Sequence, residues 1–263
     1  MKGIYAIYRK EMSHYFVSPI AYIIGGVFLF LTGFFFTRVL SSVIEQAFEA
    51  GMQSMQFGGA GASYDVPSLT IRYFFGVLSS ILLFLTPMLT MGVYAEERKR
   101  GTIELLMTSP ITDAQIVLGK SFASLTLLII MLAPTLAYSI FMFLHSEPAA
   151  PWKILFCAYL GVLLLGGSLL ALGSLFSSLT ENQIIAAVLT FGVFLILWVI
   201  EFGSRNASTG IGAVMSYLSV VKHYDDFTRG ILDSGNVVFY LSLILLSIFL
   251  TIRSLDSMRW RRA

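Results

Sequence analysis

The residues best suited to chemistry are the charged ones, and they gather in one short stretch, residues 94–110. Its centre is the block E-E-R-K-R at positions 96–100, in a chain that is 57% hydrophobic and only 12% charged. The block lies between two long apolar segments, so it is expected at a membrane surface, where charged side chains stay hydrated. Such a segment can bind a partner protein, or its charges can serve only to orient the chain in the membrane.

Residues that end and start helices divide this stretch. Gly101 is expected to end the preceding helix, and Thr102 to cap a short helix over residues 103–108. Glu104 would lie in the first turn, where the helix dipole favours an acidic side chain. Pro110 is expected to end this helix, because the residue before a proline is disfavoured in helical geometry.

A second helix start follows at once. Thr112 and Gln115 have the spacing of a capping box, and Ile111 and Ile116 have that of a hydrophobic staple. Two well-defined helix starts in one loop indicate a segment that is held in a fixed shape. We call residues 95–115 the knuckle and interpret it as a docking element; the alternative is a loop that only sets topology.

Enzymatic sites are not indicated. No H-E-x-x-H or G-x-S-x-G motif occurs, and the three histidines lie in three different segments. Gly119-Lys120-Ser121 has the form of the end of a phosphate-binding loop, but Ala114 stands where that motif needs a glycine. We therefore expect no catalytic residue, with a membrane-embedded hydrolase as the weaker alternative.

Two groups of potential metal ligands occur elsewhere in the chain. Met52 and Met55 form an M-x-x-M pair that can bind copper(I), but such soft sites usually need a third ligand. His223, Asp225 and Asp226 are close in sequence, but adjacent aspartates on a helix point to different sides. We expect no metal site at either place, and we expect a solvated outer helix around Asp225.

Six long apolar segments must position these residues. Each has about 20 residues or more, enough to cross a hydrocarbon core of roughly 30 Å. They fall near residues 20–39, 73–93, 116–144, 154–175, 184–202 and 237–254. The expected fold is an all-α integral membrane protein with a single transmembrane domain over residues 1–263. No ionisable side chain is expected deep inside a span. Because ion-coupled secondary transporters usually need such groups, this favours a protein whose energy is supplied from outside the spans.

Positive charges indicate how the chain is oriented. Residues 1–18, the knuckle and the C-terminal tail would share one side of the membrane, and together with Lys120 just after the knuckle they hold 11 of the 17 Lys and Arg residues. The positive-inside rule makes this side cytoplasmic, so both termini are expected inside the cell. The net charge of +2 does not indicate nucleic-acid binding.

The N-terminal segment has apolar positions at helical spacing among its charged residues. It is expected to be an amphipathic helix lying in the membrane interface, with Arg9 and Glu11 on it. Pro19 would mark the bend where the chain enters the bilayer. A signal peptide is the alternative, but the apolar run that follows is too long for one.

The other segments carry weaker signals. Outer loops are expected at 40–70, mobile with a short helix near 43–50, and at 203–236, with short helices before the last span. The fourth span shows small side chains on one helix face: Gly167, Ala171, Ser174 and Ser178. Such a stripe is typical of close helix contacts in bilayers, either within one chain or between two.

The knuckle sequence E-R-K-R-G-T-I-E-L-L-M-T-S-P-I, followed by Gly119-Lys120, resembles the cytoplasmic coupling segment of export-type (type-2) ABC transporter permeases. The sequence E-M-S-H-Y-F-V-S-P-I-A-Y at 11–22 resembles the segment before the first span in the gliding-motility-associated and copper-enzyme-maturation permeases. The resemblance covers nearly the whole chain. It is fairly specific for the superfamily and says little about the substrate.

This resemblance implies a six-span subunit of the bacterial inner membrane that pairs with a second copy or a related permease. A separate cytoplasmic ATPase would bind ATP and magnesium, so this chain would need no cofactor. Expected partners also include membrane lipid and an outer-face accessory protein. The alternative is a non-transporting scaffold that anchors an ATPase for gliding machinery or protein assembly. The residues implied in the ATPase contact are Glu96, Glu97, Arg98, Gly101, Thr102, Glu104, Leu105 and Pro110.

Overall fold

The computed structural model describes residues 2–57, 65–108, 110–146, 149–204 and 217–260, and these are helical without a β-strand. Six segments in these ranges are long and apolar enough to cross a membrane. They are α2 (Pro19–Phe57), α3 (Val66–Thr90), α6 (Asp113–Leu132) with η1 (Ala133–Thr135) and α7 (Leu136–His145), α8 (Trp152–Leu179), α9 (Gln183–Ser204) and α12 (Ser234–Trp260). The prediction of an all-α integral membrane protein with six spans is confirmed.

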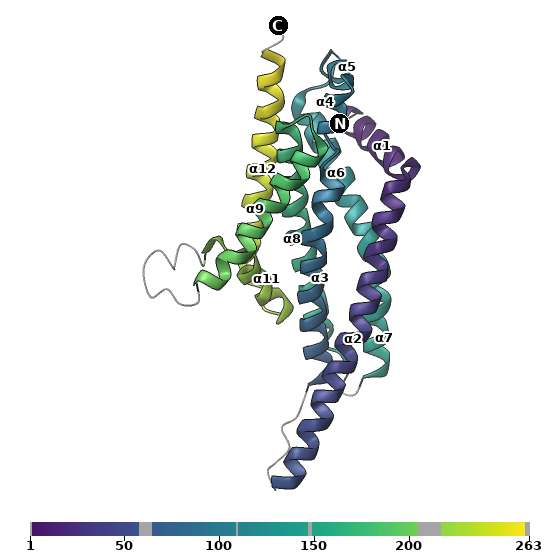
Figure 1. Ribbon diagram of the computed structural model, residues 1–263, viewed down its shortest axis with the longest axis vertical. Coiled ribbons are helices and arrows are strands. Elements are labelled where there is room, and N and C mark those ends of the chain that lie inside the picture. The colour runs from purple at the N-terminus through teal and green to yellow at the C-terminus, as the bar shows by residue number, and fades with distance from the viewer. Residues whose placement is uncertain (1, 58–64, 109, 147–148, 205–216, 261–263) are drawn as a thin grey trace.

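The chain enters the first span through a sharp bend. Helix α1 (Lys2–Val17) ends before Ser18, and α2 begins at Pro19. Proline is favoured in the first turn of a helix because its missing N–H has no partner to lose there. The bend predicted at Pro19 is confirmed. In Figure 1, α1, the end of α12 and the short helices α4 (Ala95–Lys99) and α5 (Thr102–Thr108) lie at one end of the molecule.

The expectation of a mobile loop at 40–70 is wrong for residues 40–57. Helix α2 continues without a break for 39 residues, about 58 Å at 1.5 Å per residue, against a hydrocarbon core of roughly 30 Å. Leu, Glu, Gln, Ala and Met dominate this extension, and one Gly51 costs a helix only about 1 kcal/mol. Residues 58–64, which hold three of the four glycines of the predicted loop, lie outside the described residues.

The second span also starts earlier than the apolar run suggests. Helix α3 begins at Val66, and the Asp65 carboxylate accepts a hydrogen bond from the Ser68 backbone N–H at 3.2 Å. An acidic N-cap of this kind satisfies one of the free N–H groups at a helix start. In the third predicted span, Pro134 lies in a 3₁₀ turn that interrupts the helix.

Helix α8 is the central helix of the bundle and packs against α3, α6 and α12. Its stripe of small side chains faces the interior: Ala171, Ser174 and Ser178 are buried. A Cβ on Gly167 would lie 3.5 Å from Ile244 Cδ1 of α12. The Ser254 hydroxyl of α12 donates to the Ser178 carbonyl at 3.4 Å. The stripe therefore packs within the chain, against α12.

The tightest contact of α8 lies one residue away from this stripe. A Cβ on Gly173 would be 2.1 Å from Thr90 Oγ1 at the end of α3, a distance that no side chain can occupy. Helices that cross this closely need a glycine at the crossing. The close packing of α3 and α8 at this point places the knuckle, which follows α3 directly, against the end of α8.

The expectation of a solvated outer helix around Asp225 is only half right. Helix α11 (Val220–Thr228) buries Val220, Tyr224 and Phe227, which recur at helical spacing, among the spanning helices. The Tyr224 hydroxyl donates to the Phe75 carbonyl of α3 at 2.9 Å. Asp225, on the other face, pairs with Arg72 at 3.3 Å. Residues 205–216 of this predicted outer segment lie outside the described residues.

Candidate functional site

The knuckle contains a tight reversal between α4 and α5. The Gly101 N–H donates to the Arg98 carbonyl at 3.1 Å, and the Arg100 N–H donates to the Glu96 carbonyl at 3.0 Å. Gly101 has φ +71°, in the left-handed region that residues with a Cβ rarely adopt. The predicted helix end at Gly101 is confirmed, and glycine is required there because it allows this backbone conformation at low cost.

Thr102 does not cap α5 as predicted. It is the first residue of the helix, and its hydroxyl donates to the Glu97 carbonyl of α4 at 3.3 Å. Gly101 therefore occupies the capping position. The reversal brings the end of α4 close enough to offer a carbonyl acceptor, so the hydroxyl links the two short helices instead of accepting from α5 itself.

Helix α5 has two different faces. Ile103 is 5% exposed and packs, with partly buried Leu106, in a small apolar cluster that also includes Tyr94 and Leu255. Thr102, Glu104 and Thr108 are exposed on its surface, as is Pro110 beyond the helix. The side chains of Leu105 and Met107 lie outside the described residues. The short amphipathic helix predicted at 103–108 is thus present.

The start of α6 agrees with the sequence pattern. The Thr112 hydroxyl accepts from the Gln115 N–H at 3.4 Å, and the Gln115 side-chain oxygen accepts from the Thr112 N–H at 3.4 Å. This reciprocal pair is the predicted capping box. Ile111 and Ile116 both join the apolar cluster beneath α5, as expected of a staple.

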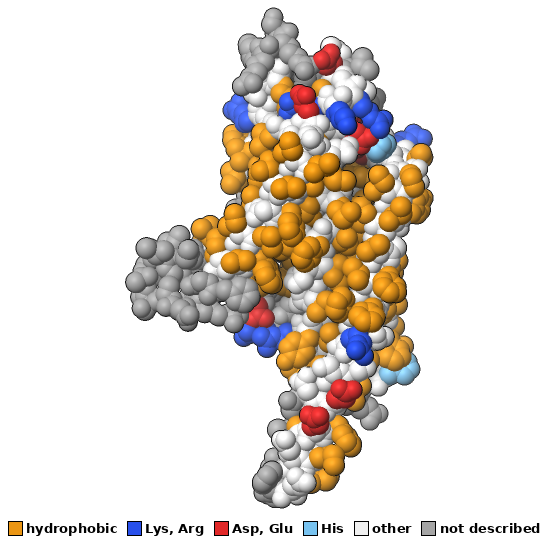
Figure 2. Space-filling model, in the orientation of Figure 1, with side chains coloured by type: hydrophobic (Ala, Val, Ile, Leu, Met, Phe, Trp, Pro, Cys, Tyr) orange, Lys and Arg blue, Asp and Glu red, His pale blue; other side chains and the backbone are white. Residues whose placement is uncertain are grey.

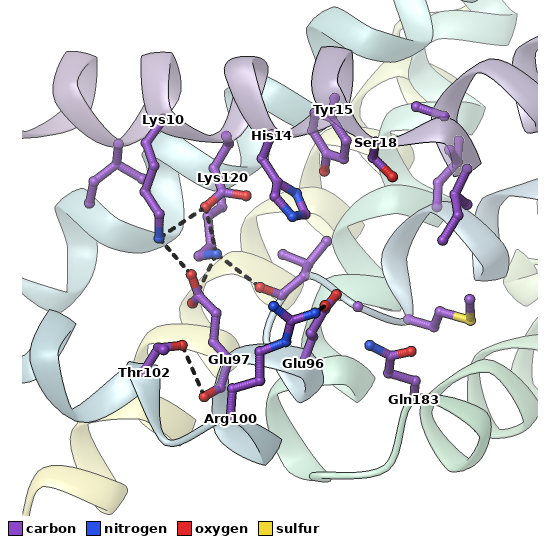
Figure 3. A pocket seen from close by; sticks show the side chains of 18 of the residues that line it. Lys10, His14, Tyr15, Ser18, Glu96, Glu97, Arg100, Thr102, Lys120 and Gln183 are labelled. Atoms are coloured by element: carbon purple, nitrogen blue, oxygen red, sulfur yellow. Dashed lines mark hydrogen bonds and ion pairs between the residues drawn. The ribbon is translucent and has the colours of Figure 1, made fainter.

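A buried lysine lies beneath the knuckle. The Lys120 side chain of α6 is 2% exposed, and its Nζ lies 2.9 Å from Glu11 Oε1, 3.0 Å from Glu97 Oε2 and 2.9 Å from the Val93 carbonyl oxygen. The ammonium donates hydrogen bonds to Glu11 Oε1 and to the Val93 carbonyl, and it forms an ion pair with Glu97 Oε2. Figure 3 shows the Lys10, Lys120 and Glu97 side chains converging from α1, α6 and α4.

We call Lys120, Glu11, Glu97 and Lys10 the Lys120 cluster. Lys10 Nζ lies 2.8 Å from Glu97 Oε1, on the more exposed side. Two ammonium groups and two carboxylates balance in charge, so their mutual attraction offsets part of the desolvation cost of burying them. The cluster joins α1, α4 and α6, so the knuckle is tied to two other helices by ion pairs.

Helix α1 is docked onto α6 and does not lie free in the interface. A Cβ on Gly119 would be 2.8 Å from Ile7 Cγ2 and 3.0 Å from the Ile4 carbonyl oxygen, so a glycine is needed where the two helices cross. The Tyr15 and Ser124 hydroxyls are 3.1 Å apart. Burial raises the pKa of the Tyr15 phenol to about 12, so the phenol stays neutral.

The other side of the knuckle is fixed to the end of α8. Arg98 Nη1 donates to the Ser178 carbonyl at 2.8 Å, and Arg98 Nη2 lies 3.1 Å from Glu181 Oε1. A cation at the C-terminal end of a helix is favoured by the free carbonyls and the helix dipole. The Ser177 hydroxyl accepts from the Tyr94 and Ala95 N–H groups at 3.0 and 3.1 Å, which anchors the start of α4.

The structure divides the predicted site residues into two groups. Glu97, Arg98 and Glu11 point inward and hold the knuckle to the bundle. Glu96 pairs with Arg100 on α4 itself. The surface group comprises Thr102, Glu104 and Pro110, and Arg9 and Pro19 are also exposed.

Lys120, Ser177 and Gly119 belong to the site, although they were not among its predicted residues. Lys120 is buried but lies near the knuckle end of α6 (Asp113–Leu132), so it does not contradict the expectation that no ionisable group lies deep inside a span. The sequence does contain one signal for Lys120: it is the sole Asp, Glu, Lys or Arg from residue 114 to residue 146, and an isolated charge in an apolar segment indicates a buried partner.

No group of three or more His, Cys, Asp or Glu side chains in the described ranges is placed to hold a metal ion. Met52 and Met55 are both exposed on α2. Asp225 pairs with Arg72, whereas Asp226 accepts from the Asn236 side chain at 2.9 Å, so the two aspartates do point to different partners.

Six apolar helices with a braced polar element at one end define the class of the protein: a multi-pass membrane subunit that presents a fixed surface segment outside its spans. The family model of ABC-2 family transporter proteins matches residues 5–255, and the chain belongs to this family. It is therefore a membrane-spanning permease of the ABC transporter type.

The curated relatives agree with this family. The chain is 27% identical over 175 residues to the probable multidrug ABC transporter permease YbhR of Escherichia coli K12, and equally to that of Escherichia coli O157:H7. The match covers 63% of this chain and 45% of each relative, so it spans about half the length of these curated relatives.

Proposed function

We propose that this permease couples ATP hydrolysis by a separate cytoplasmic ATPase to the export of a substrate, and that α5 is the element on which the ATPase acts. The observation that carries the proposal is the combination of an exposed polar face on α5 with a fixed inner face. Ile103 is buried against the bundle, while Thr102 and Glu104 are exposed.

Rigid attachment is what a coupling element needs. A flexible loop would absorb a displacement, whereas a braced helix passes it to the elements that hold it. Glu97 links the knuckle to α1 and α6 through Lys10 and Lys120, and Arg98 links it to the end of α8. We therefore assign Glu97 and Arg98 to bracing, and we assign the direct ATPase contact to the outer face of α5 and to Pro110.

The same proposal includes location and assembly. The knuckle end carries an excess of Lys and Arg, which favours a cytoplasmic position for it and for both termini in the bacterial inner membrane. ATP and magnesium would be bound by the ATPase, and a second copy or a related permease would complete the pathway. The sequence at 11–22 favours the gliding-motility-associated and copper-enzyme-maturation branch, whereas the relatives' name makes drug-like molecules a substrate class to test.

Co-purification of the ATPase with permease variants tests this proposal. Glu104→Lys reverses a charge on the exposed face of α5 and places a cation at the positive end of the helix. We expect recovery of the ATPase to fall severalfold. Glu49→Lys is the matched control, because Glu49 is also exposed but lies on the α2 extension, away from the knuckle.

Gly101→Val is a second test, of the shape of the knuckle. A β-branched residue tolerates the left-handed conformation at φ +71° poorly, so the variant should displace α5 and also reduce ATPase recovery. Expression and membrane insertion of both variants should stay near normal, since no span is changed. Full ATPase recovery with Gly101→Val and Glu104→Lys combined would refute the docking role.

A further inference from the structure

A cavity of about 620 Å³ lies in the angle between α1 and α2 on one side and α3 and α4 on the other. Its volume is in the range of roughly 300–1,000 Å³ that is usual for small-molecule sites. Figure 2 shows charged side chains at the knuckle end of the molecule, with a broad hydrophobic band directly beyond them. Both charged and apolar side chains line the cavity, so it spans the change from the charged end to the hydrophobic band.

The lining of the cavity has two halves. The half nearer the knuckle is formed by the Lys120 cluster with Glu96 and Arg100 (Figure 3). The other half is apolar: Ile20, Ala21 and Ile24 come from α2, and Met88 and Leu89 come from α3. A ligand that satisfies both halves must therefore be amphipathic, with a polar group at one end and a hydrocarbon part at the other.

The charges of the polar half balance. Lys10, Lys120 and Arg100 supply three cations, and Glu11, Glu96 and Glu97 supply three carboxylates. Lys120 is fully engaged in the cluster, but the side chains of Lys10 and Arg100 are 54% and 68% exposed. Glu96 is 28% exposed and pairs with Arg100 through Oε1, which leaves Oε2 as a further acceptor. The cavity thus offers both cationic donors and a carboxylate acceptor to a ligand.

We propose that this cavity binds a zwitterionic phospholipid whose headgroup carries a primary ammonium, of the phosphatidylethanolamine type. The phosphate would contact Lys10 and Arg100, the ammonium would donate to Glu96, and one acyl chain would cover the apolar half. The inference rests on the cavity and its charges and does not depend on ATPase docking.

Other occupants match the cavity less well. An anionic lipid would add an uncompensated negative charge to a polar half whose charges already balance, and it has no ammonium to donate to Glu96. A free phosphate or another soluble anion would leave the apolar half without contact. A choline headgroup has the same net charge as the proposed ligand, but its quaternary ammonium has no N–H to donate to Glu96. Among these ligands, only the proposed lipid matches both the charged groups and the apolar half of the lining.

Lipid retention tests the proposal. The full-length protein would be extracted from bilayers with equal amounts of phosphatidylethanolamine, phosphatidylcholine and phosphatidylglycerol, and its bound lipid quantified by native mass spectrometry. We expect severalfold enrichment of phosphatidylethanolamine on the wild-type protein. Ala21→Trp, which fills the apolar half, should abolish this enrichment. Ile23→Trp should not, because Ile23 is on the same helix but is 64% exposed and does not line the cavity.

A second variant tests the headgroup assignment without filling the cavity. Glu96→Gln removes the charged acceptor for the ammonium, so phosphatidylethanolamine should lose its advantage over phosphatidylcholine, while Glu49→Gln should leave it intact. Enrichment of phosphatidylglycerol, equal retention of all three lipids by the wild-type protein, or unchanged enrichment on Ala21→Trp would each overturn the proposal. None of these outcomes bears on ATPase recovery, so the two proposals can fail separately.

Discussion

At the scale of single residues, the knuckle depends on one buried ammonium group. The Lys120 ammonium contacts a carboxylate of α1, a carboxylate of α4 and a backbone carbonyl in the turn before α4. Each of these oxygens would be costly to bury alone, and each is balanced by the same side chain. Arg98 has the same function on the opposite side, where it contacts the end of α8.

The first prediction concerns Lys120→Met. Removal of the cation leaves Glu11 and Glu97 facing each other with side chains that are 8% and 15% exposed. Breaking a buried ion pair from one side costs roughly 3–5 kcal/mol, so the thermal midpoint of the purified protein should fall strongly. Lys10→Met is the matched control: Lys10 is 54% exposed, and an exposed pair contributes about 0–1 kcal/mol.

A rescue experiment separates charge from packing at this position. Glu11→Gln and Glu97→Gln, added to Lys120→Met, remove the unbalanced carboxylates and should restore part of the lost thermal midpoint. Equal midpoints for Lys120→Met and Lys10→Met would show that the buried ion pairs contribute no more than surface pairs do.

At the scale of elements, α1 is a structural part of the bundle. It packs along α6, and its crossing point is set by Gly119 under Ile7 and the Ile4 carbonyl. This docking brings Glu11 to Lys120 and Tyr15 to Ser124. Helix α1, which the sequence places at the membrane interface, thus also lines one side of the cavity and supports the knuckle.

The second prediction tests this packing with two glycine substitutions. Gly119→Ala places a methyl group 3.0 Å from a backbone oxygen, so α1 must shift and the thermal midpoint should fall. Gly26→Ala is the control, because a Cβ there meets nothing within 4 Å. Alanine is favoured over glycine in a helix by about 1 kcal/mol, so the control should be neutral or slightly stabilised. Stabilisation by both changes would show that α1 is not held against α6.

At the scale of the whole molecule, α2 connects the two ends. It begins beside the knuckle and extends, in Figure 1, past the other spanning helices at the opposite end. Its last turns carry exposed Phe48, Met52 and Met55. Because the helix is unbroken, the accessibility of its ends reports the orientation of the whole chain in the membrane.

The third prediction uses this geometry. Met55→Cys, at an 88% exposed position on the far end of α2, should react with an impermeant thiol reagent in intact cells. Thr108→Cys, at the knuckle end, should react only after the membrane is permeabilised. Background labelling should be low, since the native Cys157 is buried. Labelling of Thr108→Cys in intact cells would place the knuckle outside and contradict the positive-inside orientation.

The sequence by itself determined the features that depend on neighbouring residues. Apolar runs long enough for a bilayer predict the six spans, Pro19 and Gly101 mark a bend and a reversal, and Thr112 with Gln115 defines a helix start. These signals are local, because hydrogen bonding within a helix and the conformational limits of glycine and proline act over a few positions. The cap predicted at Thr102 from local sequence was wrong, because its hydroxyl donates to the Glu97 carbonyl of the preceding helix.

Only the tertiary structure decided which distant residues meet. Lys120 and Glu11 are 109 positions apart in the chain, and Arg98 and Ser178 are 80 apart. Nothing in either local pattern specifies these partners, because buried charges are paired wherever the packing of α1, α6 and α8 brings a complementary group within reach. The knuckle is recognisable in the sequence, but its bracing and the cavity beside it exist only because separate helices converge there.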